Sequence, residues 1–150
     1  MTDDYKATCA KNNTEKRNIL KKQKIISLEI FKFKEKESCL GLSFSWDKDK
    51  SYFISLEKSD SEIYGELKSL LEREDLLVLG FDLKHQFKLL SDFDLKIKGQ
   101  YFDNKIAHYL VNPDLNHDFK TSCQTYLNYS PDLNNESKVQ VCMEKSDLNF

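Results

Sequence analysis

The sequence predicts an α/β domain in which helices flank a mixed β-sheet. Three segments between residues 24 and 57 have the β-branched and aromatic composition of strands, and together they predict an antiparallel meander. Helical spacing of apolar residues follows, interrupted by the continuous apolar run of residues 75–81. Such a run is typical of a parallel strand that is covered on both faces. The 150 residues are enough for one domain with its own core.

Bulk composition narrows the classes of function. With 39% hydrophobic and 32% charged residues, the chain suits a soluble globular protein rather than a disordered one. It has no apolar run long enough to cross a bilayer and no secretory signal, so we expect a cytoplasmic protein with no membrane partner. A net charge of −2 argues against binding nucleic acid by bulk charge. Widely spaced cysteines predict free thiols rather than a zinc site; they are Cys9, Cys39, Cys123 and Cys142.

The N-terminal half is expected to hold one short helix, the meander and a second helix. Asn13 or Thr14 caps the first helix, and Asp60 or Ser61 caps the second. Charged turns separate the strands. The expected ranges are 13–23 for the first helix, 24–33, 39–46 and 51–57 for the strands, and 59–74 for the second helix.

In the C-terminal half the buried strand runs directly into a helix, residues 82–93. A connection over 94–102 holds at most a short strand, and two more helices follow over 103–113 and 117–129. After Pro131 the chain becomes polar, and we expect no regular element there. These observations divide the chain into a tail with a short helix (1–23), the domain (24–131) and a polar C-terminal tail (132–150).

Burial is expected for several large apolar side chains. Phe44, Trp46, Leu77 and Leu79 are predicted core residues by their positions in the strands. Tyr101 and Phe102 are expected to be buried as well, rather than free to stack on a base.

Polar residues gather at one predicted edge of the sheet. In α/β sheets, sites tend to form at the carboxyl ends of parallel strands. The strand that ends at Gly80 brings Asp82 and Gln86 to this edge, and the first strand brings Ser27 or Glu29 close to them. This edge is the predicted functional site.

Four sequence segments carry a resemblance to a known family. They are "GLSFSW" (41–46), "GFDLKHQFKLL" (80–90), "KGQYFDNKIAHYLVNPDLNHDF" (98–119) and "TYLNYSP" (125–131). In this order and spacing the chain resembles the 3′–5′ exonuclease domain of bacterial DNA polymerase I, a protein of DNA replication and repair. The resemblance implies a ribonuclease H-like fold and DEDD chemistry. Four carboxylates then hold two Mg²⁺ or Mn²⁺ ions, which activate a water and stabilise the charge on the scissile phosphate.

The first motif of the family, Asp-x-Glu, aligns with Ser27-Leu28-Glu29 after a one-residue adjustment of the following loop. In this register the glutamate is kept as Glu29 and the aspartate has become Ser27. The ungapped alternative, Ile26-Ser27-Leu28, keeps no acid. A neutral hydroxyl cannot replace a carboxylate that bridges two metal ions.

The second motif, Asn-x-x-x-Asp, reads Asp82-Leu83-Lys84-His85-Gln86. Gln86 thus replaces the aspartate that binds metal, and Asp82 stands at the asparagine position, where it is either an extra metal ligand or a helix N-cap. The third motif, Tyr-x-x-x-Asp, has no match between Ser130 and Phe150. Of the four metal carboxylates, at most Glu29 remains.

Other polar residues at helix starts have a simpler interpretation. Asp103 opens a predicted helix and is expected to cap it, and His117-Asp118, which matches an "HD" of the family, is expected to be a local structural feature at the start of the next helix. The three histidines, His85, His108 and His117, do not have the spacing of a metal site.

We therefore expect a catalytically inactive exonuclease-like domain that acts as a scaffold or a weak DNA-contacting module and needs no cofactor. One alternative is an active 3′–5′ exonuclease that uses Mg²⁺ or Mn²⁺ with rearranged ligands, Glu29 and Asp82 together with Asp103. The other is a small protein-interaction module, because loss of the family's last helix would leave apolar surface for a polymerase domain or another protein chain.

Overall fold

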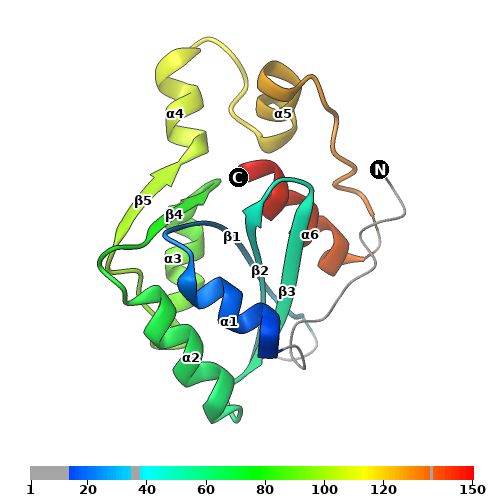
Figure 1. Ribbon diagram of the computed structural model, residues 1–150. Helices are drawn as coiled ribbons and strands as arrows, with labels where there is room; N and C mark the ends of the chain where they lie inside the picture. Colours follow the sequence, from blue (N-terminus) through cyan, green and yellow to red (C-terminus); the bar gives the residue numbers. More distant parts are fainter. Residues whose placement is uncertain (1–13, 35–37, 136) are drawn as a thin grey trace.

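The computed structural model describes residues 14–34, 38–135 and 137–150, which form a five-stranded sheet with helices on both faces (Figure 1). The strand order is β3-β2-β1-β4-β5. The strands are β1 (Ile25–Lys32), β2 (Cys39–Asp47), β3 (Lys50–Glu57), β4 (Leu77–Gly80) and β5 (Gln100–Asp103). The helices are α1 (Thr14–Lys22), α2 (Ser61–Leu71), α3 (Leu83–Ser91), α4 (Asn104–Val111), α5 (Phe119–Leu127) and α6 (Lys138–Asn149).

The sheet is mixed, as predicted. β1, β2 and β3 form an antiparallel meander in which Leu28 pairs with Phe44. β4 lies parallel to β1, with Ile26 opposite Val78, and β5 continues the sheet parallel to β4. The α/β class with a meander and parallel strands is therefore confirmed, and the connection over 94–102 does contain the start of a short strand.

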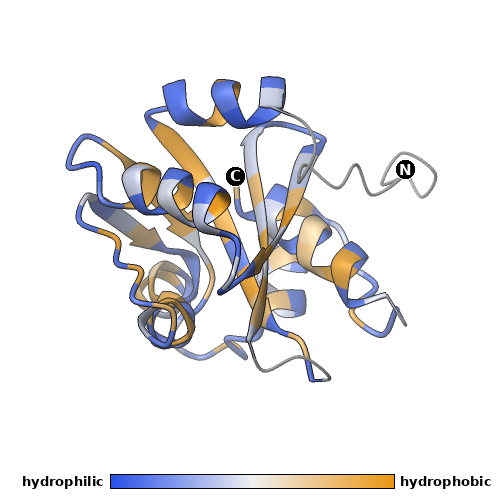
Figure 2. Cartoon of the chain, turned by 90° about the horizontal axis from the view of Figure 1, so that it is seen from below, coloured by the Kyte–Doolittle hydropathy of each residue, from blue (hydrophilic) through white to orange (hydrophobic). Residues whose placement is uncertain are grey.

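The two faces of β1 differ in chemistry. Ile26, Leu28 and Ile30 belong to the main core, which also contains Leu67 and Leu71 of α2. The residues between them, Ser27 and Glu29, face the opposite side, where each makes a hydrogen bond with α6. Figure 2 shows the apolar strands enclosed between the helices. The alternation of side chains along a strand thus places an apolar face toward α2 and a polar face toward α6.

Helix α6 corrects the prediction that residues 132–150 are a polar tail without a regular element. Ser137 caps this helix through Gln140 N, and α6 packs against β1, β2 and β3. Its buried residues are Cys142, Met143, Ser146 and Asn149, of which only two are hydrophobic. The helix escaped sequence prediction because its buried face lacks the apolar stripe that usually marks an amphipathic helix.

Several core predictions also need correction. Phe44 is fully buried, but Trp46, Leu77 and Leu79 are only partly buried. Leu76 and Val78 are the buried residues around β4, so the strand alternates and is less completely covered than its apolar run suggests. Tyr101 and Phe102 are 57% and 50% exposed because β5 is an edge strand, so the prediction of their burial is wrong.

Aspartates stand at the N-cap positions of four described helices, α2, α3, α4 and α5. Asp60, one of the two residues predicted to cap its helix, accepts a hydrogen bond from Ile63 N, and Asp118 accepts one from Thr121 N at 2.7 Å, so both cap their helices. The expected cap Asn13 lies outside the described residues. Gly99 precedes β5 where a Cβ atom would collide with the carbonyl oxygens of Leu76 and Arg73, so this close backbone approach requires glycine.

The structure describes three of the four cysteines. Cys39, Cys123 and Cys142 are buried free thiols, while Cys9 lies outside these ranges. In the part of the chain that the structure describes, none of the helices combines the length and the apolar character of a transmembrane span.

Candidate functional site

The predicted edge of the sheet contains an ion pair between β1 and α6. Lys145 Nζ lies 2.7 Å from Glu29 Oε1, and Gln86 Nε2 donates a hydrogen bond of 3.0 Å to Glu29 Oε2. Gln86 Nε2 also donates to the Phe81 carbonyl oxygen, at 3.1 Å. Each oxygen of the Glu29 carboxylate therefore has a donor supplied by the protein itself.

Burial dominates the electrostatics of this group. Glu29 is 8% exposed and Gln86 is 2% exposed. Loss of hydration raises the pKa of the Glu29 carboxyl above its usual range, and the charge and hydrogen bond of Lys145 offset that rise only in part. Burial also raises the pKa of the Cys142 thiol, which donates a hydrogen bond of 3.3 Å to the backbone oxygen of Glu29.

Serines fill the space beside this ion pair. Ser27 Oγ donates a hydrogen bond to the backbone oxygen of Ser146, and Ser43 Oγ lies 2.7 Å from Ser146 Oγ. All three serines are completely buried. The polar face of the sheet and α6 thus satisfy each other's hydrogen bonds without water between them.

Asp82 and Asp103 form a separate cluster. Asp82 pairs with Lys105 Nζ at 2.9 Å, and this hydrogen bond lowers the pKa of the Asp82 carboxyl. Asp82 precedes α3 in the left-handed region, at φ 57°, and its side chain does not cap the helix. Asp103 does so instead: its carboxylate accepts from the backbone N–H groups of Asp82, Leu83 and Lys105, so it serves both α3 and α4.

These residues do not fit the metal pair that the fold family uses. Two divalent ions need several carboxylate oxygens, whereas Ser27 and Gln86 are neutral and both oxygens of Glu29 are engaged. The Lys145 ammonium also lies where it would repel a cation. Among the described residues, His, Cys, Asp and Glu side chains do not form a group of three that could hold a metal ion. In particular, the structure does not join Glu29, Asp82 and Asp103 in one ligand set.

The residues of the two possible registers on β1 lie on different faces of the sheet. Ser27 and Glu29 face the site, and Glu29 contacts Gln86. Ile26 and Leu28, the outer residues of the ungapped alternative, are part of the apolar core on the other face.

Sequence reasoning missed the contribution of α6. Lys145, Ser146 and Cys142 all contact the segment Ser27–Glu29. Cys142 and Ser146 are four residues apart, the same spacing as the Tyr and Asp of the family's third motif. A search for a tyrosine and an aspartate at this spacing could not find the segment, because a cysteine and a serine stand at the two positions.

Comparison of the structure with solved structures gives the same fold. Brucella melitensis NrnC shares 13% identity with this chain, with a TM-score of 0.68, and the alignment covers 85% of this chain and 69% of NrnC. NrnC bound to pGG gives a TM-score of 0.65 at 14% identity, covering 85% and 67%. The Aedes aegypti Nibbler EXO domain gives 0.57 at 16% identity, covering 89% and 73%. At these identities the likeness concerns the fold.

Comparison of the sequence gives the family. No curated protein matches the chain. The family described as DNA polymerase I, ribonuclease H-like domain, matches residues 26–139, which is more than half of the chain. The matched range contains the helices α2 to α5 and the whole sheet except Ile25, the first residue of β1. This protein therefore belongs to the family of DNA polymerase I ribonuclease H-like domains.

Proposed function

We propose that this protein is a catalytically inactive exonuclease-like domain, related to DNA polymerase I, that acts as a scaffold or a weak DNA-contacting module. One observation carries the proposal: the Lys145 ammonium contacts Glu29 at 2.7 Å, and Glu29 is the residue that the resemblance aligns with a metal carboxylate. A fixed positive charge supplied by the protein then takes the place of the metal ions.

The chemistry of the other positions supports loss of activity. Hydrolysis with two metal ions requires carboxylates to hold both ions against the scissile phosphate. Ser27 and Gln86 supply a hydroxyl and an amide at two of these positions. On α6, Cys142 and Ser146 occupy, in this proposal, the positions of the third-motif tyrosine and aspartate. One buried carboxylate remains, and its partner is an ammonium group.

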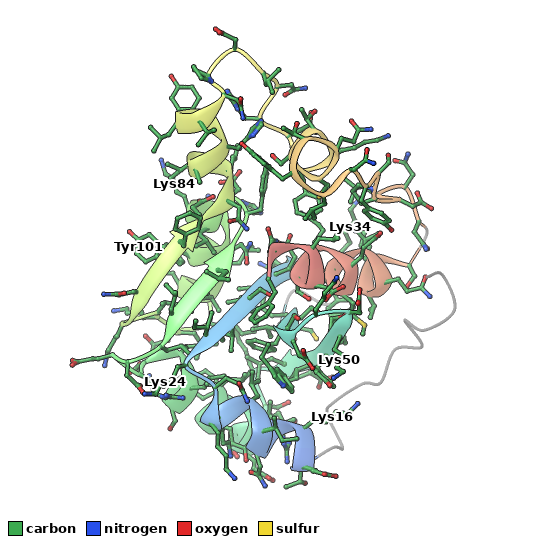
Figure 3. All side chains as sticks on the ribbon, turned by 45° about the horizontal axis from the view of Figure 1, so that its top comes forward. Lys16, Lys24, Lys34, Lys50, Lys84 and Tyr101 are labelled. Atoms are coloured by element: carbon green, nitrogen blue, oxygen red, sulfur yellow. The ribbon has the colours of Figure 1, made fainter. Side chains whose placement is uncertain are left out.

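A second surface supports weak contact with nucleic acid. A groove of about 310 Å³ has both lysines and aspartates in its wall, which consists of Asp82, Lys84, Asp103, Lys105, Ile106, Tyr109 and His117. Tyr101, on the neighbouring edge strand, is also exposed (Figure 3). Lys84 and the exposed aromatic rings can contact the phosphates and bases of a single strand in turn, whereas Lys105 is already paired with Asp82. The related fold of NrnC is known in a complex with pGG, which agrees with such contact.

A nuclease assay tests the inactive state directly. The purified chain is incubated with a 5′-labelled single-stranded DNA and with an RNA of the same sequence, in Mg²⁺ and separately in Mn²⁺. We expect no shortening from the 3′ end at any protein concentration. Metal-dependent shortening that disappears in the Glu29→Ala variant would overturn the proposal and would favour an active site with rearranged ligands.

Fluorescence anisotropy tests the contact with DNA. We expect binding to labelled single-stranded DNA with a Kd on the order of 10⁻⁴ M that weakens as salt rises. The double variant Lys84→Ala/Lys105→Ala should weaken it further, whereas Lys58→Ala, on the other side of the sheet order, should not. Equal binding by all three proteins would contradict the proposed groove, and absence of binding would leave the scaffold role alone.

A second candidate function is protein interaction, favoured by the outward face of α4. Ile106, Tyr109, Leu110 and Val111 are 58%, 54%, 74% and 68% exposed. An apolar cluster of this kind often marks an interface. Light scattering at rising protein concentration tests self-association; a monomer in the native protein and in Leu110→Glu would count against it. A cytoplasmic location remains a prediction.

A further inference from the structure

A small cavity lies between the C-terminal half of α3 and the connection that leads to the edge strand β5. Its volume is about 230 Å³, and its wall consists of Phe87, Leu90, Ser91, Leu95, Lys96 and Ile97. The wall is apolar except for Ser91 and Lys96, which are both exposed to solvent. This volume is below the roughly 300–1,000 Å³ of pockets for drug-sized ligands, and it suits a single ring such as a pyrimidine base.

An exposed aromatic ring continues the wall of this cavity. Tyr101, on β5, is 57% exposed, and its ring meets the ring of Phe87 edge to face, with centroids 5.0 Å apart. Phe87 therefore both lines the cavity and supports Tyr101. Because the Tyr101 ring is held by this contact and still open to solvent, a base can stack on it at a small cost in side-chain entropy.

Three lysines border the cavity and the ring. Lys84 and Lys88 lie one turn apart on the exposed side of α3, and Ser91 lies one turn further, so one stripe of the helix leads to the mouth of the cavity. Lys96 provides the third ammonium group, in the wall itself. Figure 3 shows Lys84 and Tyr101 on the same side of the molecule.

The charges of these three lysines are available to a ligand. None of the three forms an ion pair with a described residue. No Asp or Glu is among the described residues that line the cavity. Asp92 and Asp94 follow α3, but Asp94 is itself paired with Lys68 at 3.3 Å. The surface therefore attracts an anion to the mouth of an apolar cavity.

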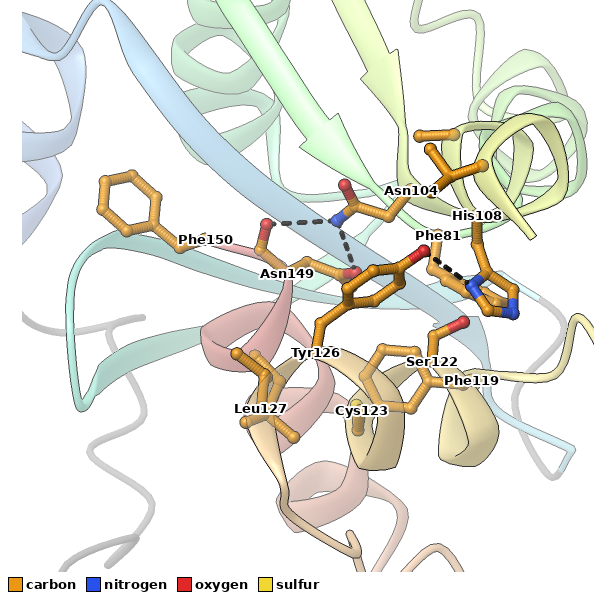
Figure 4. A pocket seen from close by; sticks show the side chains of 13 residues that line it. Phe81, Asn104, His108, Phe119, Ser122, Cys123, Tyr126, Leu127, Asn149 and Phe150 are labelled. Carbon is orange, nitrogen blue, oxygen red and sulfur yellow. Dashed lines mark hydrogen bonds between the residues drawn. The ribbon is translucent and has the colours of Figure 1, made fainter.

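The larger cavity of the molecule lacks this combination. It has a volume of about 390 Å³ between α4, α5 and the end of α6, and no Lys or Arg is among the described residues of its wall (Figure 4). Its polar groups are bonded to one another, Asn104 to Asn149 and His108 to Tyr126 (Figure 4). It offers a phosphate group neither a counter-charge nor a free donor at its rim.

We propose that a single strand of DNA runs along α3, with one base in the smaller cavity, a neighbouring base on the Tyr101 ring and phosphates on Lys84, Lys88 and Lys96. Lys84 also lines the groove at the start of α3, so the two surfaces are continuous. The inference rests on the proposed contact with DNA and adds the course of the strand beyond that groove.

Oligonucleotides of two lengths test this course. Fluorescence anisotropy measures the binding of labelled (dT)₈, which can occupy the groove and the cavity together, and of (dT)₂, which can occupy only one of them. We expect (dT)₈ to bind at least fivefold more tightly. Three phosphate contacts predict a slope of about −2 for the logarithm of its affinity against the logarithm of salt concentration.

Four variants connect the binding to the residues. Tyr101→Ala should weaken (dT)₈ about fivefold or more, because it removes a stacked base. Lys96→Glu should weaken it at least threefold and reduce the salt slope by about 0.7. Ser91→Leu fills the mouth of the cavity and should weaken binding without changing the slope. Lys138→Glu, at an exposed position on α6, makes the same change in net charge and should bind like the native protein. Circular dichroism verifies that each variant is folded.

The outcomes separate this inference from the proposed contact with DNA. Weaker binding in Tyr101→Ala, Lys96→Glu and Ser91→Leu, with native affinity in Lys138→Glu, supports the course of the strand. Native affinity in both Lys96→Glu and Ser91→Leu would overturn it and leave the groove as the site of contact. Equal losses in Lys96→Glu and Lys138→Glu would also overturn it, because net charge would then explain the effect. Absence of binding by the native protein would remove the contact with DNA and this course with it.

Discussion

Lys145 on α6 donates a hydrogen bond of 2.7 Å to Glu29 on β1, a contact between residues 116 positions apart in the chain. The pair connects the last helix to the central strand of the sheet. Gln86, on α3, donates a hydrogen bond to the other oxygen of the Glu29 carboxylate. This arrangement gives the polar face of the sheet an internal cation. Its energetic importance can be measured without knowing the ligands of the domain.

Replacement of Lys145 by methionine should destabilise the fold. The change leaves the Glu29 carboxylate buried without its counter-charge, and breaking a buried pair in this way costs about 2–4 kcal/mol. Lys138→Met is the matched control, because Lys138 is exposed on the first turn of the same helix, and it should cost less than about 0.5 kcal/mol. Urea denaturation of both variants measures the difference. Equal stabilities would show that the pair contributes nothing.

Stability should fall as the pH rises from weakly acidic toward neutral. The pKa of Glu29 is raised above its ordinary value of 4.5, so between that value and the folded pKa the native state binds more protons than the unfolded state. The contribution of Glu29 is thus complete below 4.5 and is lost as pH rises through the folded pKa. One proton limits the slope to about 1.4 kcal/mol per pH unit.

The pH effect can be assigned by substitution. Glu29→Gln should remove this slope in urea denaturation above about pH 5, since the variant cannot titrate there. Asp82 and Asp118 have lowered pKa values and act with the opposite sign, at pH below their ordinary value of 3.8, so they do not disturb that window. A slope that survives in Glu29→Gln would assign the effect to another group.

Asp103 and Asp82 should differ in their effect on stability although both are aspartates at the start of helices. Asp103→Ala removes the acceptor for three backbone N–H groups at the starts of α3 and α4, and we expect a loss of about 2–3 kcal/mol. Asp82→Asn removes a half-exposed pair with Lys105, keeps a residue type that tolerates φ 57°, and should cost less than about 1 kcal/mol. Thermal denaturation followed by circular dichroism compares the two. The reverse order would refute the assignment of Asp103 as the cap.

Divalent ions should leave the stability unchanged. A ligand that binds the folded state raises Tm in proportion to the logarithm of its concentration over Kd. Because Glu29 is engaged by Lys145, we expect Mg²⁺ or Mn²⁺ at about 10 mM to shift Tm by less than roughly 1 °C relative to EDTA. Calorimetry provides the measurement. A larger rise, abolished by Glu29→Gln, would show that a metal displaces Lys145.

Local patterns predicted most of the fold. The meander, β4 and the helices through α5 follow from strand composition, helical spacing and capping residues, which act over a few positions of the chain. β5 was expected only as a short strand. The prediction that Tyr101 is buried was wrong, because its exposure depends on the place of β5 at the sheet edge and therefore on the strand order. Helix α6 was missed because it buries Cys142, Ser146 and Asn149 in place of an apolar stripe.

Only those residues of the site that lie on predicted strands and helices could be placed from the sequence. The strand positions of Ser27 and Glu29, and the position of Gln86 one turn into α3, follow from period and topology. The partner of Glu29 does not, because Lys145 is one lysine among many and only the packing of α6 on β1 selects it.

The late position of α6 has a consequence for how the chain folds. During synthesis all five strands leave the ribosome before this helix does, so the serine-lined face of the sheet meets water until α6 has left the ribosome as well. Contacts between residues so far apart in sequence close slowly, because a long loop must be ordered first. The nascent domain should therefore acquire its apolar layer first and complete its polar layer in a final, slower step.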